Sequence, residues 1–158
     1  MKRFDIIDAD TLNKVEGWAD KLVKRIQVEM QNQGINASGK LSNSLEYNVA
    51  DNQIQVLANN YFLYAEKGRD KGKIPNNFSD ILETWIADKH IAIPSKFKTP
   101  SQFAWAIAMK IKRYGSNKYR NPSKRQDVVG KPLSEMLPEL NNIIQNRVVL
   151  YINDNLFN

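Results

Sequence analysis

The sequence predicts an α+β fold in which a small antiparallel β-sheet packs against a long N-terminal helix and two to three C-terminal helices. Apolar residues recur every three or four positions over residues 11–33, which indicates an amphipathic helix. They alternate with polar residues at about 45–58, which indicates a β-hairpin. Helical spacing returns in the second half of the chain. The length of 158 residues and the apolar content of 42% fit a single domain spanning residues 1–158.

The helix expected at 11–33 carries start and stop signals. Its apolar stripe consists of Leu12, Val15, Ala19, Leu22, Ile26 and Met30. Asp8 and Asp10 offer side-chain oxygens to the free amides at its start, and Gly34 easily turns left-handed at its end. Gly17 in the interior weakens the helix by about 1 kcal/mol relative to Ala, so the helix depends on packing.

The hairpin expected at about 45–58 has two strands with the same alternating pattern. Its apolar residues are Leu45, Tyr47, Val49, Ile54, Val56 and Ala58. Asp51 and Asn52 lie between the strands and tolerate the positive φ of a tight turn. The pattern leaves room for one further strand. The aromatic run that follows, residues 61–65, has no clear period and no assigned conformation.

Two helices are expected in the middle of the chain. The first covers residues 78–89, where apolar residues share one face. The second begins at Pro100, because Thr99 can cap it and proline is favoured at the first helical position. Gly115 ends this second helix.

A last helix is expected near the C-terminus. Its apolar residues are Leu140, Ile143, Ile144, Val148, Tyr151 and Ile152. Pro138 should occupy its first turn, because a proline deeper in a helix breaks the hydrogen-bond ladder. Residues 133–137 would then form a separate turn. Residues 115–131 contain few large apolar side chains and are expected to form an exposed basic loop or arm.

The search for catalytic chemistry predicts no catalytic residue, no metal site and no cofactor. The chain has no cysteine, and its one histidine, His90, has no motif around it and fits a structural role at a helix end. Residues 68–73 resemble a phosphate loop, but one spacer residue and the hydroxyl after the lysine are missing. Paired carboxylates on facing elements stay open as a third hypothesis, that of a carboxylate-dependent enzyme.

Basic residues gather between positions 110 and 131 of a chain whose formal net charge is +6. They are Lys110, Lys112, Arg113, Lys118, Arg120, Lys124, Arg125 and Lys131. Such residues can contact phosphates while Tyr114 and Tyr119 contact bases, which indicates sequence-independent DNA binding. A solvated charged loop is the other interpretation.

The tryptophans divide into two kinds. Trp18 and Trp85 accompany apolar stripes and are expected in the core. Trp105 lies off the main stripe of its helix, so we expect it at a contact with a neighbouring subunit. The chain has no apolar run of about 18 residues, and no membrane association is expected.

Two short motifs carry a resemblance to a known family. The first is Gly39-Lys40-Leu41-Ser42-Asn43-Ser44-Leu45, and the second is Tyr61-Phe62-Leu63-Tyr64-Ala65-Glu66-Lys67-Gly68. In this order, around a hairpin, they resemble the neck or tail-completion proteins of tailed double-stranded DNA bacteriophages. The matching positions are Gly39, Leu41, Ser44, Tyr61, Tyr64, Glu66 and Gly68. The sequence departs from the family pattern at Phe62, Ala65, Lys67 and Arg69.

This resemblance implies a structural virion protein without catalytic residues or cofactor. It implies a homo-oligomeric ring in the neck or tail region, at the junction of head and tail, that assembles in the host cytoplasm. The implied partners are portal or connector and tail proteins, with non-specific contact to packaged DNA. Arg69 is a candidate interface residue, because Glu66 can pair with it or with a residue of the next subunit.

Overall fold

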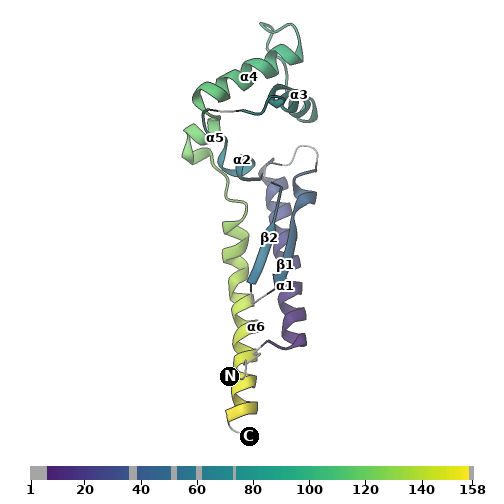
Figure 1. Ribbon diagram of the computed structural model, residues 1–158, viewed down its shortest axis with the longest axis vertical. Helices are drawn as coiled ribbons and strands as arrows, with labels where there is room; N and C mark the ends of the chain where they lie inside the picture. The colour runs from purple at the N-terminus through teal and green to yellow at the C-terminus, as the bar shows by residue number, and fades with distance from the viewer. Residues whose placement is uncertain (1–6, 36–38, 51–52, 60–61, 73, 157–158) are drawn as a thin grey trace.

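The computed structural model describes residues 7–35, 39–50, 53–59, 62–72 and 74–156 (Figure 1). Its elements in chain order are α1 (Ala9–Asn32), η1 (Ser42–Ser44), β1 (Glu46–Ala50), β2 (Gln53–Leu57), α2 (Phe62–Lys67), α3 (Phe78–Asp88), α4 (Pro100–Tyr114), α5 (Asn117–Arg120), η2 (Pro122–Lys124) and α6 (Gly130–Leu156). The predicted α+β class is confirmed. Within the described residues the sheet has two antiparallel strands.

Helix α1 forms where its apolar period and its caps predict it. Asp8 caps its start, where the carboxylate accepts a 2.8 Å hydrogen bond from the Thr11 amide. Gly34 follows the helix with a φ of 64°, in the left-handed region. The buried stripe runs along the whole helix and consists of Thr11, Val15, Trp18, Ala19, Leu22, Val23, Ile26 and Met30.

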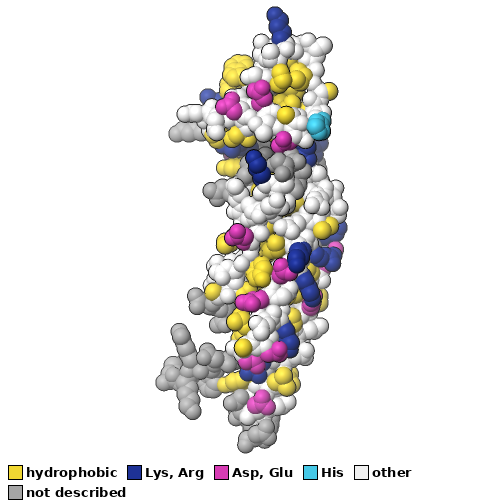
Figure 2. All heavy atoms as spheres, turned by 90° about the vertical axis from the view of Figure 1, so that its right-hand side faces the viewer, with side chains coloured by type: hydrophobic (Ala, Val, Ile, Leu, Met, Phe, Trp, Pro, Cys, Tyr) yellow, Lys and Arg dark blue, Asp and Glu magenta, His cyan; other side chains and the backbone are white. Residues whose placement is uncertain are grey.

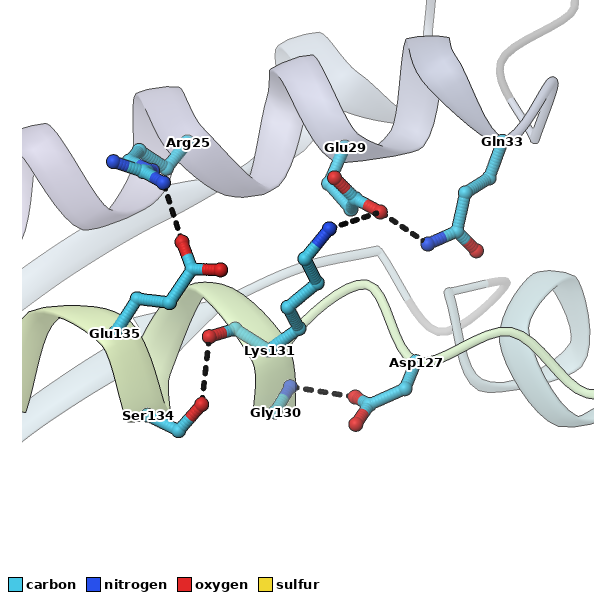
Figure 3. A network of polar contacts seen from close by, with 8 residues as sticks. All are labelled: Arg25, Glu29, Gln33, Asp127, Gly130, Lys131, Ser134 and Glu135. Atoms are coloured by element: carbon cyan, nitrogen blue, oxygen red, sulfur yellow. Dashed lines mark hydrogen bonds and ion pairs between the residues drawn. The ribbon is translucent and has the colours of Figure 1, made fainter.

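Helix α6 runs antiparallel to α1 and packs along it (Figure 1). Ion pairs join the two helices at Lys21–Glu139, Arg25–Glu135 and Glu29–Lys131, so residue numbers rise along α1 as they fall along α6. Figure 3 shows the second and third of these pairs. The first two pairs are largely exposed, and in the third the two charges are 3.9 Å apart, so these pairs stabilise the fold little. The indole Nε1 of Trp18 donates a 2.9 Å hydrogen bond to the Met136 carbonyl in the buried layer between them.

The predicted start of the last helix is wrong. Residues 133–137 are not a separate turn, because α6 begins at Gly130 and contains Pro138 in its interior. A proline there removes one ladder hydrogen bond and costs about 3 kcal/mol. Buried Met136 and half-buried Leu133 and Leu140 pack against the α1 core and offset this cost.

The hairpin covers one side of the α1 helix. Its register pairs Glu46 with Leu57 and Ala50 with Gln53, and the expected turn at residues 51–52 lies outside the described residues. Buried Leu45 and half-buried Val49 and Ile54 belong to the α1 core, as the alternation predicts. Tyr47, Val56 and Ala58 of the same alternating set remain exposed.

Helices α3 and α4 form a second hydrophobic cluster at one end of the elongated molecule (Figure 1). The Thr99 hydroxyl caps α4 by accepting a 3.2 Å hydrogen bond from the Gln102 amide, and Gly115 follows it, as predicted. The buried side chains are Phe78, Leu82, Ile86, Ala104 and Ala108. Trp18 is 2% exposed and confirms its core assignment. The core assignment of Trp85 is wrong, because its side chain lies at the edge of the cluster and is 36% exposed.

The cap at Asp8 allows a test by substitution and pH. The hydrogen bonds from Thr11, together with the charge of Arg147, lower the pKa of the Asp8 carboxyl. A carboxyl whose pKa is lower in the folded state stabilises the fold when the pH is above about 3.9, its pKa in the unfolded chain. This stabilisation is lost as the pH falls through the lower pKa of the folded state. We expect Asp8→Ala to lower the thermal midpoint at pH 7 by a few degrees, and this difference to shrink below pH 4.

The control for this test is Asp8→Asn. Asparagine also caps helices but carries no charge, so it should keep much of the stability at pH 7 and lose the acid dependence. Thermal unfolding followed by circular dichroism between pH 3 and 7 measures both effects. Equal midpoints for Asp8→Ala and the natural protein at pH 7 would contradict the capping role.

Candidate functional site

The second motif forms the joint between the two hydrophobic clusters. It folds into the short helix α2, and the chain then turns at Gly68, whose φ is 82°. The Gly68 amide donates a 3.0 Å hydrogen bond to the Tyr64 carbonyl, which closes the helix. Tyr64 is exposed and Glu66 is half-buried, while Tyr61 lies outside the described residues.

Gly68 lies in close contact with the start of α5. A Cβ atom on Gly68 would come within 2.5 Å of the Ser116 hydroxyl and of the Tyr119 amide. The next residue is locked to the same segment by two hydrogen bonds of 2.8 Å, from the Arg69 amide to the Ser116 hydroxyl and from the Ser116 amide to the Arg69 carbonyl. The motif therefore needs glycine for its conformation and for space.

Two polar side chains tie this joint to α1. The ammonium of Lys118 donates a 2.6 Å hydrogen bond to the Ala65 carbonyl and another to the Gln126 side chain. The Gln126 amide group in turn donates a 2.7 Å hydrogen bond to the Gln33 carbonyl. Desolvation lowers the pKa of Lys118, and the charge of Lys89 adds to this effect while that of Glu66 opposes it.

Arg69 is stacked between aromatic rings. Its guanidinium carbon lies 4.6 Å from the centre of the Tyr64 ring and 5.1 Å from that of Phe78. Tyr64 belongs to α2 and Phe78 to α3, so this cation joins the motif to the second cluster. Sequence reasoning placed Arg69 at an interface between subunits, and the structure places it at the junction of the two clusters.

An apolar groove of about 430 Å³ opens at this joint. Its floor and walls come from α2, α3, α4, α5 and the end of α1, with Ile81, Trp85 and Ile107 among the apolar lining residues. Arg69, Lys89 and Lys118 are the charged residues of the lining, and no acidic side chain belongs to it in the described part of the chain. Its size falls within the range of binding pockets.

The first motif supports the second through the end of the hairpin. Leu41 is buried in the α1 core, and Gly39 has a φ of 78°. The Ser44 hydroxyl donates to the Leu41 carbonyl at 2.7 Å and accepts a 3.2 Å hydrogen bond from the Asn59 amide. The Asn59 carbonyl then accepts from the Phe62 amide at the start of α2, so the two motifs are connected.

The basic residues between 110 and 131 do not share one environment. Six are exposed on α4, α5, η2 and the residue after it: Lys110, Lys112, Arg113, Arg120, Lys124 and Arg125. The other two differ from the prediction. The Lys118 ammonium points inward to the Ala65 carbonyl, and Lys131, although exposed, has its ammonium 3.9 Å from the Glu29 carboxylate of α1. Neither ammonium is directed only to solvent, which weakens both as DNA contacts.

The segment 115–131 also differs from the expected loop or arm. Most of its side chains are exposed, yet it contains α5 and η2, and α6 starts at its end. Val128 is fully buried in the α1 core, and Gln126 contacts α1. These contacts hold the segment against the body of the protein.

Two further residues that the sequence indicated, Trp105 and His90, lie on the surface. Trp105 is 58% exposed on the outer side of α4, in keeping with a contact residue. His90 is exposed just after α3 with a φ of 50°, and its amide donates to the Ala87 carbonyl. The sequence did not reveal Ser116, Lys118 and Gln126 as residues of the joint. Their partners, residues 69, 65 and 33 respectively, lie about 50 or more positions away in the chain.

Comparison with known proteins adds no relative. No protein-family model matches the chain, and neither the curated proteins nor the solved structures contain a match. Across the described ranges, no cluster of three or more acidic, histidine or cysteine side chains is placed to hold a metal ion. None of the helices described is long and apolar enough to cross a membrane.

Proposed function

We propose that this protein is a structural virion subunit of a tailed bacteriophage, a neck or tail-completion protein that joins head and tail. The observation that carries the proposal is the joint itself. Residues of the two motifs, which resemble that family, are connected by the hydrogen bonds from the Asn59 amide to the Ser44 hydroxyl and from the Phe62 amide to the Asn59 carbonyl. They sit beside an apolar groove rather than around a reactive group.

The surface is compatible with a role in assembly. Large apolar side chains are exposed at several places, including Trp105 on α4 and Val149 on α6. Figure 2 shows basic and acidic side chains interspersed along the elongated lower part of one face, with hydrophobic side chains near the α3–α4 end. Tryptophan is enriched among the side chains that anchor protein–protein contacts, so exposed Trp105 suits such a contact.

The decisive experiment is removal of the gene from the phage that encodes the protein. Electron microscopy of the lysate should show DNA-filled heads and separate tails that do not join, and the infectious titre should fall by orders of magnitude. A plasmid copy of the gene should restore both. Normal, infectious particles assembled without the protein would contradict the proposal.

The alternative function is sequence-independent DNA binding by the exposed basic residues. It is supported by Arg113 and Arg125, whose guanidinium carbons lie 5.6 Å and 5.9 Å from the centres of the Tyr114 and Tyr119 rings. Cations beside exposed aromatic rings suit a surface that contacts phosphates and bases together. A ring around DNA would unite this alternative with the structural role.

DNA binding is tested by its salt dependence. Replacement of Arg113, Arg120, Lys124 and Arg125 by glutamine should reduce the slope of log K against log salt by about 0.9 for each phosphate that the variant no longer neutralises. The matched control replaces Lys14, Lys21, Lys24 and Arg25, which removes the same charge from α1. Fluorescence anisotropy with a labelled duplex measures both variants. Equal slopes for the two variants, or no binding at low salt, would reject the alternative.

A further inference from the structure

We infer that the free end of α6 in one copy seats in the apolar groove of a second copy, so that the chain associates head to tail. This inference deepens the proposed function and rests on it for its biological meaning. Each copy carries both sides of this contact. One side is an exposed apolar helix end, and the other is a groove lined by apolar side chains and cations.

The end of α6 projects beyond its partner helix. The Arg147 guanidinium lies 3.3 Å from the carboxylate of Asp8, the residue that caps the start of α1. The nine residues from Val148 to Leu156 therefore continue past the start of α1 (Figure 1). At 1.5 Å per residue this overhang is about 14 Å long. α1 therefore offers it no further helical surface on which to pack.

The overhang exposes three large apolar side chains beside the polar Asn153 and Asp154. Val149 is 56% exposed, Leu150 is 55% exposed, and Ile152 is exposed as well. Val149 and Ile152 are three positions apart and share a face, the spacing with which an amphipathic helix anchors itself in a groove. Large apolar side chains this exposed at a helix end favour burial against a partner.

The charges of the two surfaces complement each other. The groove lining carries three cations, Arg69, Lys89 and Lys118, and no acidic side chain among the residues described. From Val148 to the end of the chain, Asp154 is the only charged side chain. An acidic residue beside apolar anchors is the chemistry that suits a cation-lined apolar groove.

The two surfaces cannot meet within one molecule. Gln126, which lines the groove, lies just before the start of α6, and the overhang forms the other end of this helix. The 27 residues of α6 separate these ends by about 40 Å in a rigid helix. The contact must therefore join two copies. Repeated from copy to copy in one direction it is heterologous and produces a ring or a filament, whereas two copies that exchange their helix ends close as a dimer.

The experiment uses the full chain and two complementary variants in analytical ultracentrifugation. The helix variant carries Val149→Asp with Leu150→Asp, and the groove variant carries Ile81→Asp with Trp85→Ala. All four side chains are exposed, so the thermal midpoint of each variant should stay near that of the natural protein. Each variant alone should self-associate at least ~30-fold more weakly.

Mixing the variants gives the sharpest result. The helix variant keeps an intact groove and the groove variant keeps an intact helix end, so an equimolar mixture should form a one-to-one dimer that does not grow further. Val28→Asp is the control, because it places one aspartate, as the groove variant does, at a valine of α1 about as exposed as Val149, and it should associate like the natural protein.

Several results would overturn the inference. The natural chain could stay monomeric at all concentrations, or the groove variant could associate normally while the helix variant does not, which would indicate a symmetric contact between α6 ends. A monomeric chain whose gene is still needed to join heads and tails would reject this contact alone, whereas failure of the gene-removal test would reject the proposed function.

Discussion

Substitution of Gly68 by alanine should destabilise the protein by about 3 kcal/mol or more, from two effects that act together. A φ of 82° costs a side-chain-bearing residue about 1–2 kcal/mol. The new Cβ would also approach the Ser116 hydroxyl and the Tyr119 amide to 2.5 Å, so the start of α5 must move away. Such overpacking adds about 1–3 kcal/mol.

Gly34→Ala is the matched control for this variant. Gly34 also has a positive φ, of 64°, but nothing lies within 4 Å of its Cβ position. Gly34→Ala should lower the free energy of unfolding only by the conformational cost, about 1 kcal/mol. This corresponds to a fall of about 2–4 °C in the thermal midpoint. Gly68→Ala should lose about three times as much. Equal losses for the two variants would show that Gly68 and α5 are not packed as described.

Truncation of Trp18 to alanine should cost about 3–5 kcal/mol, the range for large aromatic side chains in a core. The indole is 2% exposed between α1 and α6, so its removal leaves a cavity that both helices line. The variant also loses the hydrogen bond to the Met136 carbonyl. Urea unfolding followed by far-ultraviolet circular dichroism measures the effect without depending on tryptophan fluorescence.

Two controls separate the causes of this loss. Trp18→Phe keeps most of the apolar volume and should fall between the natural protein and Trp18→Ala. Trp105→Ala removes a side chain that is 58% exposed and should change the stability of the monomer by less than about 0.5 kcal/mol. If Trp105→Ala is as destabilising as Trp18→Ala, the assignment of Trp18 to the core and of Trp105 to the surface is wrong.

Part of the candidate site could be predicted from the sequence. The second motif marked Glu66 and Gly68, Arg69 was named beside it as a candidate interface residue, and the structure places all three at the joint. The partners that hold this unit were not predicted. Ser116 and Lys118 are ordinary polar residues in a basic segment, and nothing in their neighbourhood shows that they contact residues about 50 positions earlier.

The elements whose causes are local can be predicted from the amino-acid sequence alone. The caps at Asp8 and Thr99, the stops at Gly34 and Gly115, and the apolar periods act within a few residues, so α1, the hairpin, α3 and α4 lie where predicted. Hydrogen bonds between positions i and i+4 and between adjacent strands make these signals readable along the chain.

How these elements combine depends on contacts between distant parts of the chain. Local preferences place Pro138 in the first turn of a helix, but burial of Met136 against α1 stabilises a helix α6 that contains Pro138 in its interior. Lys118 is a surface cation by local rules, but the Ala65 carbonyl draws it inward. The groove is built from residues between Gln33 and Gln126 that meet only after folding. These three features depend on burial and on long-range contacts. The free energies of such contacts depend on neighbours in space rather than in sequence.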